Sequence, residues 1–313
     1  MREAGLYCPS GDFYIDPCEP VDRAVVTHAH SDHAFPGSRN YLTAADGEAI
    51  LRARLGDEAS IQSIRYGESL QMGGVAVSLH PAGHILGSAQ IRLERAGEIW
   101  VVSGDYKLAP DPTCAPFETL RCHTFVTEST FALPIFRWPA PASTVDAIHS
   151  WWRANRDAGR TSVLFAYPLG KAQRVLAAID RSIGPISAHP SIERYNAIYR
   201  VAGIKLPETA AAAPGALILA PPGATERYTK ASTAFVSGWM RIRGPRRRRS
   251  LDRGFVMSDH ADWDGLLSAI DATGAETVWV THGYRAPLVR WLEEHGRAAV
   301  SVDTHAEARE DEQ

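Results

Sequence analysis

Residues 24–33 read Ala-Val-Val-Thr-His-Ala-His-Ser-Asp-His, a short apolar run followed at once by a dense group of polar side chains. The apolar run predicts a buried strand, and the polar residues after it predict a tight loop. Imidazole and carboxylate groups are ligands that zinc takes at neutral pH. Chance rarely places so many of them directly behind a buried strand. The loop therefore predicts a metal site that uses His28, His30, Asp32 and His33.

Further candidate ligands follow the same arrangement, in which an apolar strand leads to a small residue and then to a ligand. They are His84 after the stretch 75–79, Asp105 after the stretch 98–102, and His282 in WVTHGY. Taken alone, each could be an ordinary hydrogen-bonded turn residue. Strand ends on one side of a sandwich converge in space, so we expect these side chains to meet. His260 in MSDHADW and Glu128 in VTEST fit the same pattern, with His260 as a further ligand or an acid and Glu128 as the group that orients it.

Composition limits what surrounds this site. The 313 residues are 45% hydrophobic and 22% charged, which is typical of a globular protein with a sizeable core. Because the formal net charge is −3, a bound polyanion must be held by a local basic patch. The four cysteines form no Cys-x-x-Cys pair, and we find no apolar leader or membrane-spanning stretch. We therefore expect free thiols, a cytoplasmic location and no contact with a membrane.

The expected secondary structure changes character along the chain. The first part predicts short strands at 75–79, 89–93 and 98–102 and a helix at 45–56. The stretch FALPIFRWPAPAS at 131–143 is rich in proline and aromatic residues and is typical of a connection between domains. The middle part alternates strands and helices, including a helix at 144–158 capped by Ser143, as in a parallel α/β sheet. Strands return near Gly254, with helices at 263–272, capped by Asp262, and at 286–295.

Taken in chain order, these motifs resemble the β-CASP nucleases of the metallo-β-lactamase superfamily. HAHSDH is similar to the signature loop, Asp16 in YIDP to the first-motif aspartate, and PAGHILGSAQ and SGDYK to the third and fourth motifs. VTEST, SDHAD and THG resemble the motifs specific to β-CASP members. Several stretches, among them LYCPSGDFYIDP, LGKAQR and SGWM, are most similar to the bacterial ligase-associated DNA exonucleases, relatives of Artemis.

The resemblance implies an α/β fold, a four-layer αβ/βα metallo-β-lactamase sandwich with an inserted β-CASP domain. We expect the sandwich to occupy 1–133 and 244–313 and the β-CASP domain to occupy 134–243. It also implies two zinc ions, with manganese as an alternative. One would be held by His28, His30, His84 and bridging Asp105, and the other by Asp32, His33, Asp105 and His282. Asp32, His260 and Glu128 are the implied catalytic residues, with His260 as the general acid.

Phosphate contacts are expected outside the metal site. The basic run contains Arg241, Arg243, Arg246, Arg247, Arg248 and Arg249. It is either a solvated loop or a set of contacts along a nucleic-acid strand. Ser237, Gly238 and Ser258 are the candidates for a pocket that recognises a terminal phosphate. We interpret Trp151 and Trp152, in contrast, as core residues.

The function implied is a DNA exonuclease, of 5′→3′ polarity by resemblance, that acts in repair beside an ATP-dependent DNA ligase and a helicase. One alternative is an RNA-processing nuclease, either an endonuclease or an RNase J-like exonuclease, which the presence of His282 favours. A non-catalytic β-CASP subunit is disfavoured because the chain keeps all the ligands. A small-molecule hydrolase is disfavoured by the expected insert and the arginine run.

Overall fold

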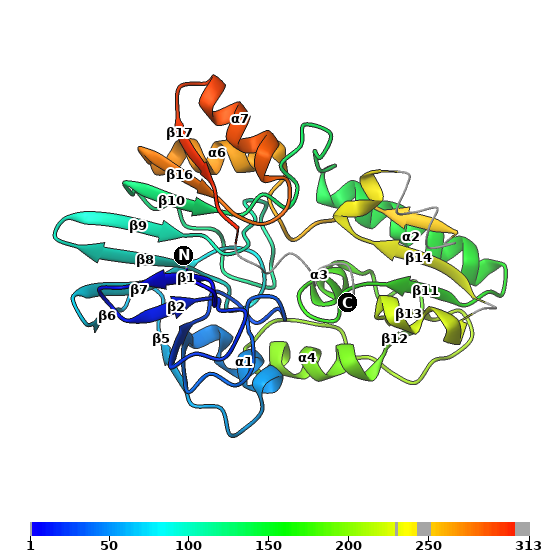
Figure 1. Ribbon diagram of the computed structural model, residues 1–313. Coiled ribbons are helices and arrows are strands. Elements are labelled where there is room, and N and C mark those ends of the chain that lie inside the picture. The colour runs from blue at the N-terminus through cyan, green and yellow to red at the C-terminus, as the bar shows by residue number, and fades with distance from the viewer. Residues whose placement is uncertain (1, 229–230, 243–251, 304–313) are drawn as a thin grey trace. The chain divides into compact units, whose positions relative to one another are not determined.

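The structure is a computed structural model that describes residues 2–228, 231–242 and 252–303, and it has a mixed α/β fold (Figure 1). The chain divides into two compact units. One holds the described residues up to Pro134 and from His260 onward, and the other is Ile135–Asp259. We expected the inserted part to end at residue 243. The second unit runs on to Asp259 because β15 (Arg253–Phe255) pairs in parallel with β14 (Ser232–Val236) and extends its sheet.

The first unit contains two sheets. One has the strand order β1 (Leu6–Cys8), β2 (Phe13–Ile15), β3 (Arg23–Val25), β4 (Asn40–Ala44), β5 (Ile61–Ile64). The other has the order β17 (Ala298–Ser301), β16 (Thr277–Val280), β10 (Thr124–Thr127), β9 (Glu98–Val102), β8 (Ala89–Arg95), β7 (Val75–Pro81), β6 (Ser69–Met72). β3, β9, β10 and β16 all lie in parallel segments of these sheets, so the loops after neighbouring strands leave from the same edge.

The apolar strands of the larger sheet face two cores. Neighbouring residues point to opposite faces of a strand, so Val102 and Val126 pack toward the smaller sheet while Val101 and Phe125 pack on the other face. That other face is covered by α6 (Trp263–Thr273) and α7 (Arg285–Glu294), which lie beside β16 and β17 in Figure 1. α1 (Glu48–Leu55), preceded by η1 (Ala45–Gly47), packs beside β5. Burial on both faces explains why β9 is a continuous apolar run.

The second unit is built on one parallel sheet of order β12 (Ile186–Ala188), β13 (Leu217–Ala220), β11 (Ser162–Phe165), β14, β15. α2 (Pro141–Asp157) and α3 (Lys171–Ala178) pack on one face. α4 (Pro190–Val201) lies against α3, and η2 (Pro222–Tyr228) and η3 (Gly238–Arg241) lie on the side of the opposite face. Trp151 and Trp152 are buried in the first of these cores, as predicted.

Some expected elements need correction. α2 begins at Pro141, because proline suits the first turn of a helix, and Ser143 donates its hydroxyl to the Ala140 carbonyl instead of capping the helix. β12 and α4 were not expected, and His189, to which we gave no role, accepts the Ser191 backbone N–H at the start of α4. The Asp262 cap of α6 is confirmed by its bond from the Gly265 N–H. Within the described residues, every helix is too short or too polar to cross a bilayer.

Candidate metal centre

The loop after β3 is held in place by Asp16, which itself has a left-handed backbone with φ 43°. One carboxylate oxygen accepts the Thr27 backbone N–H at 2.8 Å, and the other accepts the Thr27 hydroxyl at 2.5 Å. That second oxygen also lies 2.7 Å from His33 Nδ1. A carboxylate at Nδ1 fixes the ring so that Nε2 faces the opposite way, which is how ligating histidines are usually oriented. Asp16 therefore prepares His33 to bind a metal through Nε2.

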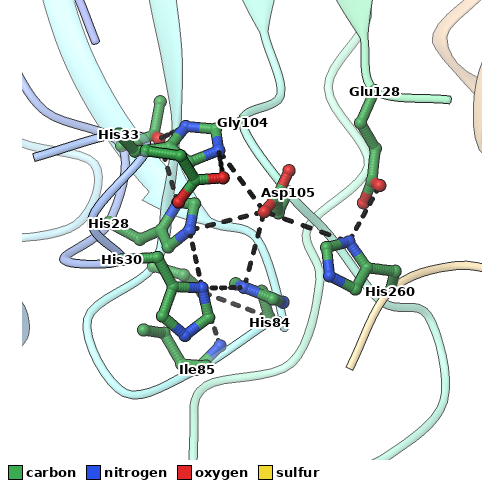
Figure 2. A network of polar contacts seen from close by, with 12 residues as sticks. His28, His30, His33, His84, Ile85, Gly104, Asp105, Glu128 and His260 are labelled. Atoms are coloured by element: carbon green, nitrogen blue, oxygen red, sulfur yellow. Dashed lines mark hydrogen bonds and ion pairs between the residues drawn. The ribbon is translucent and has the colours of Figure 1, made fainter. Parts of the chain in front are cut away.

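Asp105, three residues after Val102 at the end of β9, lies at the centre of the histidines (Figure 2). Its Oδ2 is 3.4 Å from Nε2 of both His28 and His33, and 3.7 Å from Nε2 of His84. Nδ1 of His30 lies 3.1 Å from Nε2 of both His28 and His84. The sequence spreads these residues over three loops, after β3, β7 and β9, and the fold brings the loops together as predicted.

The donor set has the properties expected of a metal site. Among the described residues, His33 Nε2 and Asp105 Oδ1 are buried side-chain atoms without a hydrogen-bond partner. A buried polar atom without a hydrogen-bond partner destabilises the folded state, and a bound ion is one partner that can satisfy it. Potential ligand atoms of His28, His30, His84 and Asp105 all lie within 4.8 Å of one another, and those of Asp32, His33 and Asp105 do so as well. Nitrogen and carboxylate donors at this density fit zinc.

His282 lies at the edge of this cluster. Its ring stacks on that of His33 with centroids 5.1 Å apart, and Nδ1 is 3.0 Å from the Thr281 hydroxyl. That hydroxyl donates to the Thr127 carbonyl at 3.1 Å, so we assign Nδ1 of His282 as the donor to it, which leaves Nε2 as the ligand atom. His282 has φ 50°, a strained backbone for a non-glycine residue. The structure therefore places it next to the second donor group, although not within the tight groups above.

Electrostatics favour the ligand forms of these side chains. Burial and nearby imidazoles hold the pKa of His28 well below its ordinary value, and they also lower the pKa of His282. Burial opposes ionisation of Asp105, but His33 and His260 outweigh it and hold its pKa well below the usual range. At His33 burial is likewise outweighed, here by Asp105 and other carboxylates, so the pKa is raised. His28, His282 and Asp105 are thus in the forms that bind a cation, whereas His33 must lose a proton to do so.

A second arrangement joins His260 to Glu128. Glu128 is buried, and its Oε2 lies 2.9 Å from His260 Nδ1 while its Oε1 accepts the Tyr106 backbone N–H at 2.8 Å. Nδ1 of His260 is 3.9 Å from Asp105 Oδ2, so the pair borders the metal cluster, as Figure 2 shows. A carboxylate at Nδ1 leaves Nε2 to exchange a proton with a reacting group. The His260 side chain is 19% exposed, which gives it access to water.

A buried ion pair was missed by reading the sequence. Lys107 Nζ lies 2.7 Å from Asp111 Oδ2, and both side chains are at most 3% exposed. The pair holds the loop after Asp105, and the Lys107 carbonyl packs so closely on Gly83 that a Cβ there would lie 2.3 Å away. Since Gly83 precedes His84, this contact fixes two ligand loops against each other. A charged residue two positions after Asp105 was the available signal.

The predicted phosphate-binding residues lie in the second unit. Ser237 and Ser258 follow the carboxyl ends of neighbouring parallel strands, β14 and β15. Ser237 caps η3 by accepting the Trp239 N–H, Gly238 is buried, and Ser258 is buried with its carbonyl bonded to Arg174. Arg241 is exposed at the end of η3. The other predicted arginines, Arg243 and Arg246–Arg249, lie outside the described residues.

The chain is similar in sequence to proteins that are named as nucleic-acid enzymes. It is 31% identical over 310 residues to a probable DNA ligase of Opitutus terrae, which covers 95% of this chain and 30% of that protein. It is 25% identical over 206 residues to an RNase J-like protein of Methanocaldococcus jannaschii, covering 58% of this chain and 49% of that one. The chain thus spans less than half of each relative. No family model matches.

The fold also has a solved counterpart. A crystal structure of a protein of unknown function from Enterococcus faecalis superposes with a TM-score of 0.62 at 14% identity, covering 90% of this chain and 78% of the other. At this identity the similarity concerns the fold alone.

Proposed function

We propose that this chain is a metal-dependent nuclease of the β-CASP group of the metallo-β-lactamase superfamily. The observation that carries the proposal is the convergence of four histidines and Asp32 around Asp105, with the His260–Glu128 pair at the border. Similarity to a probable DNA ligase and to an RNase J-like protein supports a nucleic-acid substrate.

Two zinc ions, or manganese in their place, are the cofactors that we infer. Bound there, the ions would lower the pKa of a water nucleophile and neutralise charge on the phosphate oxygens. His28, His30, His84 and Asp105 would hold one ion. Asp32, His33, Asp105 and His282 would hold the other, with Asp105 shared between the two.

The remaining chemistry belongs to the His260–Glu128 pair. As the bond between phosphorus and the leaving oxygen breaks, His260 gives the proton on Nε2 to that oxygen. Glu128 accepts the Nδ1 N–H, which keeps the ring oriented and stabilises its protonated form. His260 then regains a proton from water, to which its side chain is partly open.

Within this class we favour a DNA exonuclease of 5′→3′ polarity that works in repair beside an ATP-dependent ligase and a helicase. Similarity over nearly the whole chain to a protein named as a probable DNA ligase supports this assignment. The alternative, an RNA-processing nuclease, is supported by His282 next to the second donor group and by the RNase J-like relative.

The test offers matched DNA and RNA strands, labelled at the 3′ end and carrying either a 5′-phosphate or a 5′-hydroxyl. We expect DNA to be hydrolysed faster than RNA, with loss of nucleotides from the 5′ end and a preference for the 5′-phosphate. Faster hydrolysis of RNA would favour the alternative, and products that shorten from the 3′ end would contradict the polarity. Absence of hydrolysis of either strand by zinc- or manganese-loaded protein would overturn the nuclease assignment.

A further inference from the structure

Aromatic side chains gather in the second unit where the segment after Pro134 meets the turn after β14. The ring of Phe136 lies 6.0 Å from that of Trp138 and 5.8 Å from that of Trp239, in the latter case edge to face at 88°. Phe136 is buried, whereas both tryptophans are half-buried. The buried phenylalanine thus contacts two large aromatic side chains that are both partly exposed. Neither ring belongs to the metal centre.

Hydrogen bonds and close packing hold the two segments of this aromatic cluster together. Ser237 Oγ accepts the Trp239 backbone N–H at 3.3 Å, which fixes the turn that carries Trp239. The next residue, Met240, is buried against Gly254, where a Cβ would lie 2.7 Å from the methionine sulfur. Arg241 Nε donates to the Ile135 carbonyl at 3.2 Å and so joins the two segments. A preorganised aromatic surface binds a flat ligand with little loss of conformational entropy.

Charge and exposure indicate what the cluster contacts. Arg137 and Arg241 are both exposed, and they lie one residue before Trp138 and two residues after Trp239 in the sequence. Tryptophans that serve only as core look different in this unit, since Trp151 and Trp152 are at most 5% exposed and donate to Ser232 Oγ and the Gly215 carbonyl. Accessible aromatic rings with flanking guanidinium groups are the combination that binds single-stranded nucleic acid, because bases stack and phosphates pair with the cations.

We propose that Trp138 and Trp239, supported by Phe136 and flanked by Arg137 and Arg241, form a stacking platform for the unpaired bases of a nucleic-acid strand. The proposal rests on the proposed nuclease function and adds that the substrate is held as a single strand. Base faces are common to DNA and RNA, so the platform accepts either. In a duplex the same faces are covered by stacking, which makes the paired form the weaker ligand.

Binding is measured by fluorescence anisotropy on the Asp105→Asn background, with zinc present, so that hydrolysis does not intervene. The probes are short labelled strands of DNA and of RNA, a strand of equal length with abasic residues, and the DNA duplex. We expect Trp138→Ala and Trp239→Ala each to weaken binding of the base-containing strands about 5- to 100-fold. Binding of the abasic strand should not change, and Trp→Phe at either position should restore most of the affinity.

Trp100→Ala is the matched control, because Trp100 is also half-buried and packs edge to face on Trp279 in the first unit. It should leave binding unchanged. Equal losses on base-containing and abasic strands, or no loss at all, would overturn the platform. If an alanine variant fails to fold, binding by the parent protein is the test. Equal affinity of the parent protein for base-containing and abasic strands would also overturn the platform.

The proposed nuclease function is tested apart from this. If the zinc-loaded parent chain hydrolyses the strand but binding does not depend on either tryptophan, the platform is contradicted and the nuclease function stands. Base-dependent binding without hydrolysis would keep the platform and remove the function.

Discussion

Replacing Glu128 by glutamine removes the negative charge beside His260 Nδ1 while keeping the size and shape of the side chain. The buried carboxylate faces two N–H groups, His260 Nδ1 at 2.9 Å and the Tyr106 backbone N–H at 2.8 Å. A carboxylate has two acceptor oxygens, but a glutamine amide has only one. In the variant one of the two donors must face an NH₂ group, and the protonated form of His260 loses its counter-charge.

The expected loss follows from the role of His260. General acid catalysis contributes about 10²- to 10⁴-fold to rate, so Glu128→Gln should lower kcat by about that factor, or about 3–5 kcal/mol in activation free energy. Zinc content should remain that of the unchanged chain, because Glu128 is not one of the inferred ligands. Glu118→Gln is the matched control. Its carboxylate lies 3.1 Å from His80 Nδ1, away from the inferred catalytic residues, and kcat should not change.

The assay compares two leaving groups. Single-turnover hydrolysis of an ordinary labelled strand is measured beside that of a nucleoside p-nitrophenyl phosphate, whose leaving group needs no proton. The loss in Glu128→Gln should be large for the strand and small for the nitrophenyl ester. A loss of the same size on both substrates would refute the assignment of His260 as the acid, and a rate close to that of the parent on the strand would refute the importance of the pair.

Further predictions concern the ligands, the ligand loops and pH. Asp105→Ala should abolish hydrolysis more completely than His282→Ala, because Asp105 serves both inferred ions; near-parental kcat in Asp105→Ala would contradict this. Lys107→Met should lower the free energy of unfolding in urea by about 3–5 kcal/mol, because the buried Asp111 carboxylate loses its lysine counter-charge, and an unchanged midpoint would contradict it. Burial lowers the pKa of His149 in the folded protein. Below about pH 6.5 the unfolded chain therefore binds more protons than the folded one, and the stability decreases as the pH is lowered. His149→Gln should therefore weaken the acid destabilisation, and identical pH profiles of thermal unfolding would argue against it.

Patterns local in the chain predicted the strands that carry the site. β9 was predicted at its observed bounds, because an apolar run between polar turns already contains the information for a strand buried on both faces. The expected convergence of His28, His84 and Asp105 is confirmed by their distances, although β7, which precedes His84, pairs antiparallel with both of its neighbours.

Contacts between distant residues could not be predicted in the same way. Nothing local shows that Lys171 and Arg174 both bind Asp259. These pairs depend on tertiary burial, which removes long charged side chains from the surface where sequence alone would place them. β12 has only three residues, too few for a recognisable strand pattern, and it is a strand because it pairs with β13.

The metal content of the purified chain tests the nuclease assignment most directly. Inductively coupled plasma mass spectrometry should find about two transition-metal ions, zinc above all, per chain, because seven inferred ligand residues, Asp105 among them, lie together. Asp105→Ala should retain far less metal, while hydrolysis by the parent chain should disappear on chelation and return when zinc or manganese is added. A chain that holds no stoichiometric zinc, manganese or iron, and whose activity is indifferent to chelation, would contradict a two-metal nuclease.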